Sequence, residues 1–329
     1  MIIENSRGPP ICGRVCLADV LKLITGKLIQ GVLMVLIVSA VTFALLGAAG
    51  GDALTALRDN PQISEATIEN LRRVYGLDRP LPVRFARWFG GALTGDLGES
   101  ISFRVPVVGL ISTRMLNTLY LSAAALVFAP LISLTLSFLA ARRPGKPINF
   151  VIEAFVLLTA STPRIVLALL ALMAIAMMTG SAIAVGSGSL FSFALTAFVL
   201  ASPLIAIFLA QGHEQLTAAM NEDFVSLARA KGLSETVLII RHASRAALGP
   251  LLTLFGLSLG GLLGGSVIVE TILGWPGIGS LMVSAVRTRD VPLVMGIVLV
   301  ASVAVWLGNT LAEVLQIVND NRLRSGDAK

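Results

Sequence analysis

Charged side chains are scarce in this chain. Only 13% of its 329 residues are Asp, Glu, Lys or Arg, whereas 55% are hydrophobic. Soluble domains carry about 25% charged residues, so a soluble protein of this composition could not cover its surface with polar groups. The composition therefore excludes an ordinary soluble domain and indicates a polytopic membrane protein.

Histidine and cysteine are equally scarce, with two of each. Cys12 and Cys16 have no second cysteine pair that would complete a zinc site, so two reduced thiols are the plainer interpretation. His213 and His242 are too few for a metal cage or a histidine-based acid–base site. We therefore expect no metal and no catalytic residue in this chain, which should not itself be an enzyme.

Signals for nucleotide and nucleic-acid binding are also missing. Neither Gly26-Lys27 nor Gly145-Lys146 follows a glycine at the spacing of a phosphate-binding loop, so no nucleotide cofactor is expected in this chain. The net charge of +6 is not arranged as a basic stripe with interleaved aromatic residues. Since cytoplasmic loops of membrane proteins carry an excess of Lys and Arg, we expect contact with membrane lipid and no nucleic acid.

Six apolar segments are long enough to cross a membrane as helices, which takes roughly 20 residues each. They predict an all-α integral membrane protein with transmembrane helices at 28–49, 115–141, 150–179, 191–211, 251–273 and 293–318. The third segment is over-long and contains Pro163, which predicts either a kink or a start in the membrane interface.

Lys and Arg cluster on one predicted side of these helices. The clusters fall within residues 7–27, 142–146, 229–245 and 322–329. The long 50–114 segment also contains Arg, but long loops translocate largely regardless of charge. The distribution predicts an inner-membrane protein with both termini in the cytoplasm. It divides the chain into an N-terminal segment at 1–27, a transmembrane domain at 28–318 and a tail at 319–329.

The outer segment at about 50–114 carries helix-capping signals, so we expect it to be ordered. Ser64 can cap a helix that ends at Gly76, with Ile63 and Ile68 as a hydrophobic staple. A second helix is predicted from about Pro82 to the Gly95-Asp96-Leu97-Gly98 turn. The sequence leaves open whether this helix pair is a structural cover or a binding surface.

A short polar helix is predicted within the cytoplasmic loop at about 212–250. Asn221 can cap its first turn, and Gly232 can adopt the left-handed conformation that ends it. Its small apolar face consists of Phe224, Leu227 and Ala228. A capped amphipathic helix on the cytoplasmic side of a membrane protein indicates a docking surface. Ser234 begins a further helix, which we expect to stop at Gly249-Pro250.

Four residues within the spans are candidates for a translocation pathway. Ionisable groups inside a membrane are costly and indicate function by default, which draws attention to Arg164 and Glu270. Gly260 and Gly264 belong to a glycine series that lets helices approach closely. Arg164 could equally form a structural ion pair, and the glycines could serve helix contacts alone or a movable contact. These alternatives stay open.

Four motifs, in order along the chain, resemble the permease subunits of ABC importers. The motif at 224–250 is similar to the "EAA" signature, with Phe224, Ala228, Arg229, Ala230, Lys231 and Gly232. The others resemble the oligopeptide/dipeptide/nickel branch and lie at 75–82, 95–100 and 270–279, with a similar closing run at 320–324. The long outer segment after the first span resembles the first of that branch's two paired permeases.

The resemblance implies a fold, partners and a mechanism. It implies six transmembrane helices with an extracytoplasmic helical segment after the first. It also implies a second permease, two ATPase subunits that bind ATP and Mg, and a substrate-binding protein outside the membrane of a bacterium or archaeon. The helix near residue 221 would be the coupling helix, contacting an ATPase through Glu222, Asp223, Phe224, Ala228, Arg229, Lys231 and Gly232.

The chain also departs from the family pattern. Ser226-Leu227 replaces the Glu-Ala pair of the signature and removes a charged contact, and Asn321 replaces a proline in the tail. Arg164 stands where an apolar or aromatic residue is usual, which puts the general substrate expectations in doubt. Di- or oligopeptides are the expected substrates, with nickel chelates, glutathione, opines or sugars as alternatives. The rival function is a secondary transporter or channel without an ATPase.

Overall fold

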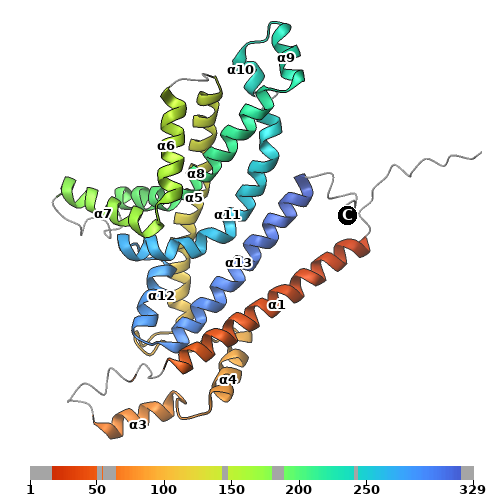
Figure 1. Cartoon of the computed structure of the whole chain (residues 1–329). Coiled ribbons are helices and arrows are strands. Elements are labelled where there is room, and N and C mark those ends of the chain that lie inside the picture. Colours follow the sequence, from red (N-terminus) through yellow and green to blue (C-terminus); the bar gives the residue numbers. More distant parts are fainter. Residues whose placement is uncertain are drawn as a thin grey trace, which may run out of the picture.

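The computed structural model describes residues 17–49, 54, 64–142, 147–179, 189–240 and 244–319, and their regular elements are helices. Figure 1 shows these helices in an elongated bundle. Their bounds are α1 Leu17–Ala48, α3 Glu65–Val74, α4 Leu81–Leu93, α5 Val107–Arg142, α6 Pro147–Ser161, α7 Arg164–Thr179, α8 Leu190–Met220, α9 Asp223–Ala230, α10 Glu235–Leu238, α11 Ser244–Leu273, α12 Ile278–Arg287 and α13 Val291–Asn319. The predicted all-α membrane fold is confirmed.

Four helices are individually long and apolar enough to cross a membrane, and two bent helix pairs raise this to as many as six spans. The pair α6 and α7 bends by 111° at the break that contains Pro163, and the two parts of α11 bend by 57°. The kink predicted at Pro163 is therefore confirmed, but it is far sharper than a bend within one straight span. Pro163 lacks a backbone N–H and disfavours a helical conformation at the residue before it, so the chain turns there.

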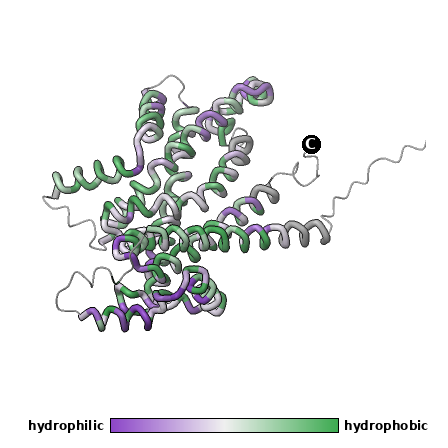
Figure 2. Tube along the Cα trace, turned by 60° about the horizontal axis from the view of Figure 1, so that its bottom comes forward, coloured by the Kyte–Doolittle hydropathy of each residue, from purple (hydrophilic) through white to green (hydrophobic). Residues whose placement is uncertain are grey.

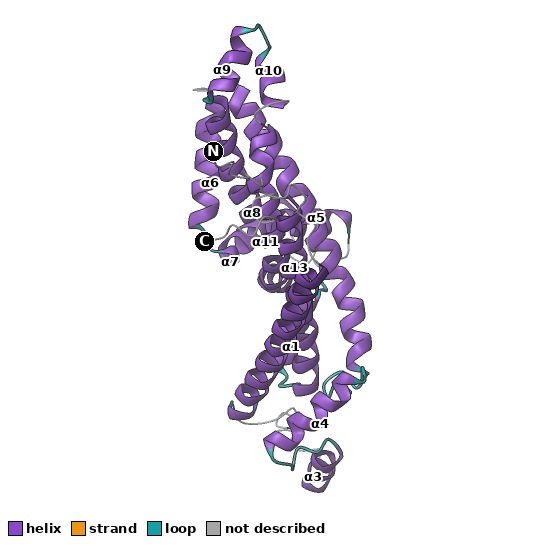
Figure 3. Cartoon of the chain, turned by 90° about the vertical axis from the view of Figure 1, so that its right-hand side faces the viewer, coloured by secondary structure: helices purple, strands orange, loops and turns teal. Residues whose placement is uncertain are grey.

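The hydrophilic residues collect at the two ends of the bundle. Figure 2 shows them on the α3–α4 hairpin and around α9 and α10, with hydrophobic residues along the helices between. Figure 3 shows the same two ends at opposite extremes of the long axis. We call them the hairpin end, formed by α3, α4 and α12, and the α9–α10 end.

Small residues bring α5 and α8 into close contact at the centre of the bundle. The hydroxyl of Ser133 donates to the carbonyl of Ile205 at 2.9 Å, and Gly212 lies directly against Ser137. Small side chains and interhelical hydrogen bonds of this kind hold helices together in lipid. Pro203 has no N–H for the Val199 carbonyl, and the hydroxyl of Ser202 donates to that carbonyl at 2.9 Å instead. The proline is thus accommodated within α8.

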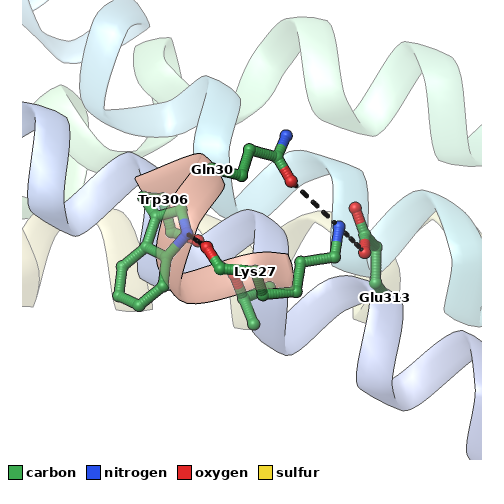
Figure 4. A network of polar contacts seen from close by, with 5 residues as sticks. Lys27, Gln30, Trp306 and Glu313 are labelled. Carbon is green, nitrogen blue, oxygen red and sulfur yellow. Dashed lines mark hydrogen bonds and ion pairs between the residues drawn. The ribbon is translucent and has the colours of Figure 1, made fainter. Parts of the chain in front are cut away.

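Helix α1 lies on the outside of the bundle against α13 (Figure 1). The two are joined by the polar cluster of Figure 4, in which Lys27 forms an ion pair with Glu313 and the indole N–H of Trp306 donates to the Lys27 carbonyl at 3.1 Å. The Trp306 ring occupies the space that a side chain at Gly31 would need. The first helix therefore begins well before residue 28, the predicted start of the span, and Lys27 belongs to this contact.

The outer hairpin follows its capping signals. The hydroxyl of Ser64 accepts from the Thr67 N–H at 3.2 Å, and Gly76 has a φ of +63° where α3 ends. The Leu77 N–H returns to the Arg72 carbonyl at 2.9 Å, as in a glycine-terminated helix. Ile63, the other half of the predicted staple, lies outside the described residues, whereas Ile68 is buried. Helix α4 begins at Leu81, as predicted.

The helix end predicted at Gly249-Pro250 is wrong. Gly249-Pro250 does not end a helix, because α11 begins at Ser244 and runs through Pro250. Proline inside a membrane helix is tolerated where neighbouring groups satisfy the freed backbone, so its presence alone did not mark an end.

Candidate functional site

Helices α9 and α10 form a small helical tip beyond the bundle (Figure 1). Helix α8 continues to Met220, and Asn221 is its C-terminal cap, so the predicted role of Asn221 as N-cap of α9 is wrong. The N-cap is Glu222, whose side chain makes no capping hydrogen bond. Only two residues separate α8 from α9. The first, Asn221, ends α8, and the second, Glu222, begins α9.

The tip has its own small core. Val225 and Ala228 of α9 are buried against Leu238 of α10, with Met220 of α8 beside them. Leu227 is 60% exposed, whereas Ala228 is buried. The predicted apolar face of Phe224, Leu227 and Ala228 is therefore not a single exposed surface. The side chain of Phe224 lies outside the described residues. The inner face of α9 is used for folding, and Leu227 lies on its outer face.

An ion pair closes the tip. The guanidinium of Arg229 donates to both carboxylate oxygens of Glu235, at 2.7 and 3.2 Å. This hydrogen bond lowers the pKa of Glu235 and raises the pKa of Arg229. Gly232 adopts a φ of +84° in the turn between them, a conformation that favours glycine.

The predicted coupling residues therefore fall into two groups. Ala228 is buried in the tip and Arg229 is paired with Glu235. The remaining members whose side chains are described are exposed, namely Glu222, Asp223 and Lys231, as is Gly232. An outer face of α9 consists of residues spaced at i, i+3, i+4 and i+7, namely Asp223, Ser226, Leu227 and Ala230, all exposed.

At the hairpin end, Glu270 lies at the centre of a buried hydrogen-bond network. One oxygen accepts from the Thr118 hydroxyl of α5 at 2.7 Å, and the other from the Gly279 N–H of α12 at 2.7 Å. The Ser280 N–H approaches the second oxygen at 3.3 Å. The carboxylate thus faces the N-terminus of α12, where free N–H groups and the helix dipole favour negative charge. Glu270 joins three helices.

Asp290 performs a similar task beyond the other end of α12, and it was not among the residues predicted from the sequence. It is fully buried, and one carboxylate oxygen accepts from the Ser100 hydroxyl at 2.6 Å and the Ser102 N–H at 2.9 Å. Its other oxygen accepts from the Leu293 N–H at 3.2 Å, which caps α13. The signal was present in the sequence: an aspartate just before a helix whose second residue is Pro292 is typical of an N-cap.

Of the other predicted pathway residues, Gly260 and Gly264 lie on α11, and Arg164 begins α7 and contacts α11. A side chain at Gly265 would overlap the guanidinium of Arg164, and one at Gly260 would overlap Asn309 of α13. A side chain at Gly264 would meet nothing within 4 Å. Gly260 and Gly265 thus allow close contacts within this chain, whereas Gly264 lies on an open face.

Two cavities open at the hairpin end. The larger, of about 430 Å³, lies between the end of α3, α4, the 96–101 segment and the start of α13, and its lining includes Arg79, Arg84 and Arg87. The smaller, of about 300 Å³, lies between the start of α5, the end of α11 and α12, and its lining includes Arg114 and Arg287. Arg79 belongs to the 75–82 motif noted in the sequence, whereas the other four arginines were not predicted to have a role.

Comparison with known proteins identifies the family. Residues 133–325 match the family described as the inner membrane component of binding-protein-dependent transport systems, and residues 20–122 match the N-terminal region of such membrane components. A protein named as a peptide permease in Brucella suis biovar 1 is 34% identical over 91% of this chain and 97% of its own length.

Further relatives agree. The oligopeptide transport system permease protein AppB of Bacillus subtilis is 33% identical over 87% of this chain and 94% of its own length. The glutathione transport system permease protein GsiC of Escherichia coli O6:H1 is 31% identical over 85% of this chain and 91% of its own length. The chain therefore belongs to the inner-membrane permease subunits of binding-protein-dependent ABC importers, in the branch that includes peptide and oligopeptide permeases.

Proposed function

We propose that this chain forms half of the translocation pathway of an ATP-driven peptide importer. Relatives named for peptides, oligopeptides and glutathione support peptides as the substrate class, since glutathione is itself a tripeptide. The partners are a second permease, two ATPase subunits that bind ATP and Mg, and an extracytoplasmic binding protein. The match of residues 20–122 to the N-terminal family supports a place as the first of the paired permeases.

The α9–α10 end faces the cytoplasm in this proposal. Arg142 ends α5 at the same end of the bundle as Arg229 and Lys231 of the tip, and cytoplasmic loops are enriched in such residues. The hairpin end then faces outward, toward the binding protein. Both termini are cytoplasmic, with 1–27 and 319–329 as the terminal segments around the transmembrane domain at 28–318.

The outer face of α9 docks on an ATPase subunit. The observation that carries this proposal is Leu227, an exposed apolar side chain at the outer face of a helix whose inner face is fixed by its own core. A helix held in this way moves as a rigid body and can transmit ATPase closure to α8 and α11. Asp223 belongs to this face. We propose that Glu222, Phe224, Lys231 and Gly232, its neighbours along the chain, also contact the ATPase, whereas Ala228 and Arg229 act indirectly by holding α9 against α10.

Arg164, Glu270, Gly260 and Gly264 retain their proposed place along the pathway, with different tasks. Glu270 and Gly260 position helices that border it, because their contacts are to other parts of this chain. Gly264 lies on the open face of α11 and is the member of this set best placed to face a moving substrate or the second permease.

The docking proposal is tested with Leu227→Glu in the complete importer reconstituted in liposomes. A buried charge at the interface is costly, so we expect the variant to lose the ATPase subunits during purification and to lose ATP-dependent peptide uptake. Val74→Glu is the matched control, because Val74 is 76% exposed on α3 at the opposite end. It should retain the ATPase subunits.

Retention of the ATPase subunits and of uptake by Leu227→Glu would reject α9 as the docking site. A wild-type chain that transports peptides without any ATPase would instead support the rival function, a secondary transporter or channel.

A further inference from the structure

The smaller cavity at the hairpin end has a polar wall built by one helix face. On α12, the side chains at Ile278, Leu281 and Ala285 are buried in the bundle. Ser280, Ser284 and Arg287, spaced at i, i+4 and i+7, share another face and line the cavity. Arg114, near the start of α5, completes this wall from a second helix. Two guanidinium groups thus border one space of about 300 Å³.

Neither guanidinium has an ion-pair or hydrogen-bond partner within the part of the chain that the structure describes. Arg114 is only partly exposed, so it has lost part of its hydration without gaining an anion. Arginines in such a position are usually paired, because an uncompensated charge away from water is costly. The cavity therefore offers two donors for an anionic group.

The acidic neighbour does not compete for these arginines. Glu270 also lines the cavity, but its oxygens accept from Thr118, Gly279 and Ser280. Its charge is directed at the N-terminus of α12, which favours an anion. A second anion can therefore enter on the side of Arg114 and Arg287.

The smaller cavity also lies at the end of an exposed face of α11. In the second half of α11, Gly264, Ile268 and Thr271 are spaced at i, i+4 and i+7 and so share one face. Gly264 and Ile268 are exposed along it, and Thr271 lines the cavity. A group bound between the two arginines would therefore lie at the hairpin end of the α11 face that carries Gly264. We call this position the mouth.

We propose that Arg114 and Arg287 bind the C-terminal carboxylate of the incoming peptide at this mouth. The inference rests on the proposed function for the identity of the substrate. A guanidinium matches a carboxylate through paired N–H···O hydrogen bonds, and a free C-terminal carboxylate is common to linear peptides of different sequence. Two arginines on different helices can hold this group while the side chains of the peptide vary.

The test measures ATP-dependent uptake of trialanine and of trialanine amide by the complete importer in liposomes. Arg114→Gln and Arg287→Gln should each raise the trialanine concentration for half-maximal uptake about 10-fold, as expected for loss of a charge-assisted hydrogen bond. Uptake of the amide relative to wild type should be unchanged. Arg73→Gln is the control, since Arg73 is exposed on α3 at the same end and lines neither cavity.

A second measurement needs no uptake. Phenylglyoxal modifies accessible arginines, and its reaction at each position of the purified importer can be read by mass spectrometry. Trialanine should slow modification of Arg114 and Arg287, its amide should not, and Arg73 should react equally in all samples. Equal effects of the acid and the amide, or no protection by either, would overturn the inference.

The two proposals fail in different ways. If the wild-type importer takes up neither peptide, the proposed function fails, and absence of protection then overturns the carboxylate site as well. If the wild-type importer takes up trialanine and the arginine variants need the same trialanine concentration for half-maximal uptake, the carboxylate site alone is wrong.

Discussion

The two ends of this molecule use their charged residues in opposite ways. At the hairpin end, Glu270 and Asp290 are fully buried, and each accepts hydrogen bonds from more than one helix or loop. At the α9–α10 end, Arg229 and Glu235 pair with each other at the exposed surface. The hairpin end is thus locked into the bundle, whereas the tip is a local unit with a few buried side chains of its own.

This difference fits the tasks that we propose for the two ends. A tip that docks on a partner needs a fixed inner face and a free outer face. A mouth built from short helices needs their ends held in place, because α12 alone is too short to be stable. Substitutions at each end test this difference.

The largest effect is expected for Glu270→Ala. It leaves the Thr118 hydroxyl, the buried N–H of Gly279 and the part-buried N–H of Ser280 without their acceptor, at a cost of about 3 kcal/mol or more. The apparent Tm of the purified chain should fall by roughly 5 °C, and the Tm of Glu270→Gln should lie between that of Glu270→Ala and that of wild type. Glu153→Ala is the control, since Glu153 is exposed on α6. Equal melting of the two alanine variants would contradict the role of Glu270.

Asp290→Ala should have the next largest effect. It removes the N-cap of α13 and the acceptor of Ser100 and Ser102, with an expected cost of about 2 kcal/mol. The same melting assay should show a fall of roughly 3 °C. Asp78→Ala, at an exposed aspartate of the hairpin, should melt as wild type does. If both variants melt alike, the hairpin end is not held by Asp290.

The two faces of α9 should respond differently to loss of a side chain. Val225→Ala removes buried methyl groups and should lower the free energy of opening of the tip by about 2 kcal/mol. Leu227→Ala should change it by less than about 0.5 kcal/mol, because that side chain is exposed. Hydrogen exchange of the α9 amides measures both. Similar losses of protection would show that the outer face is also part of the core.

The smallest effect concerns the Arg229–Glu235 pair. Because the pKa of Glu235 is lowered in the folded tip, its contribution is present above the ordinary value of about 4.5 and is lost as the pH falls through the lowered pKa. Exchange protection of α9 should therefore decrease in that acidic range in wild type and show less change in Glu235→Gln. The effect should be small, since both groups are exposed. An equal acid response in the variant would assign the change to other groups.

Local signals in the sequence predicted local structure well. Ser64, Gly76 and Gly232 each occupy the cap or turn predicted for them, because these conformations depend on residues close in the chain. The kink at Pro163 follows for the same reason. The prediction for Asn221 failed because two helices competed for one capping residue, and the sequence does not say which of them ends there.

Long-range partners could not be predicted. Glu270 was recognised as an unusual charge in a membrane span, but its bond to Thr118 joins residues far apart in the sequence. Arg114 and Arg287 of the smaller cavity gave no signal either, since single arginines near the ends of helices are common. Only the fold brings Arg114 and Arg287 to one cavity.

Site-specific photo-cross-linking tests most directly whether the outer face of α9 docks on an ATPase subunit. Benzoylphenylalanine is placed at Leu227, and at Val74 as a control, in the complete importer. We predict a cross-link to an ATPase subunit from position 227 that changes in yield when ATP is added, and none from position 74. Cross-linked products from position 227 that lack the ATPase subunit would show that this face does not dock there.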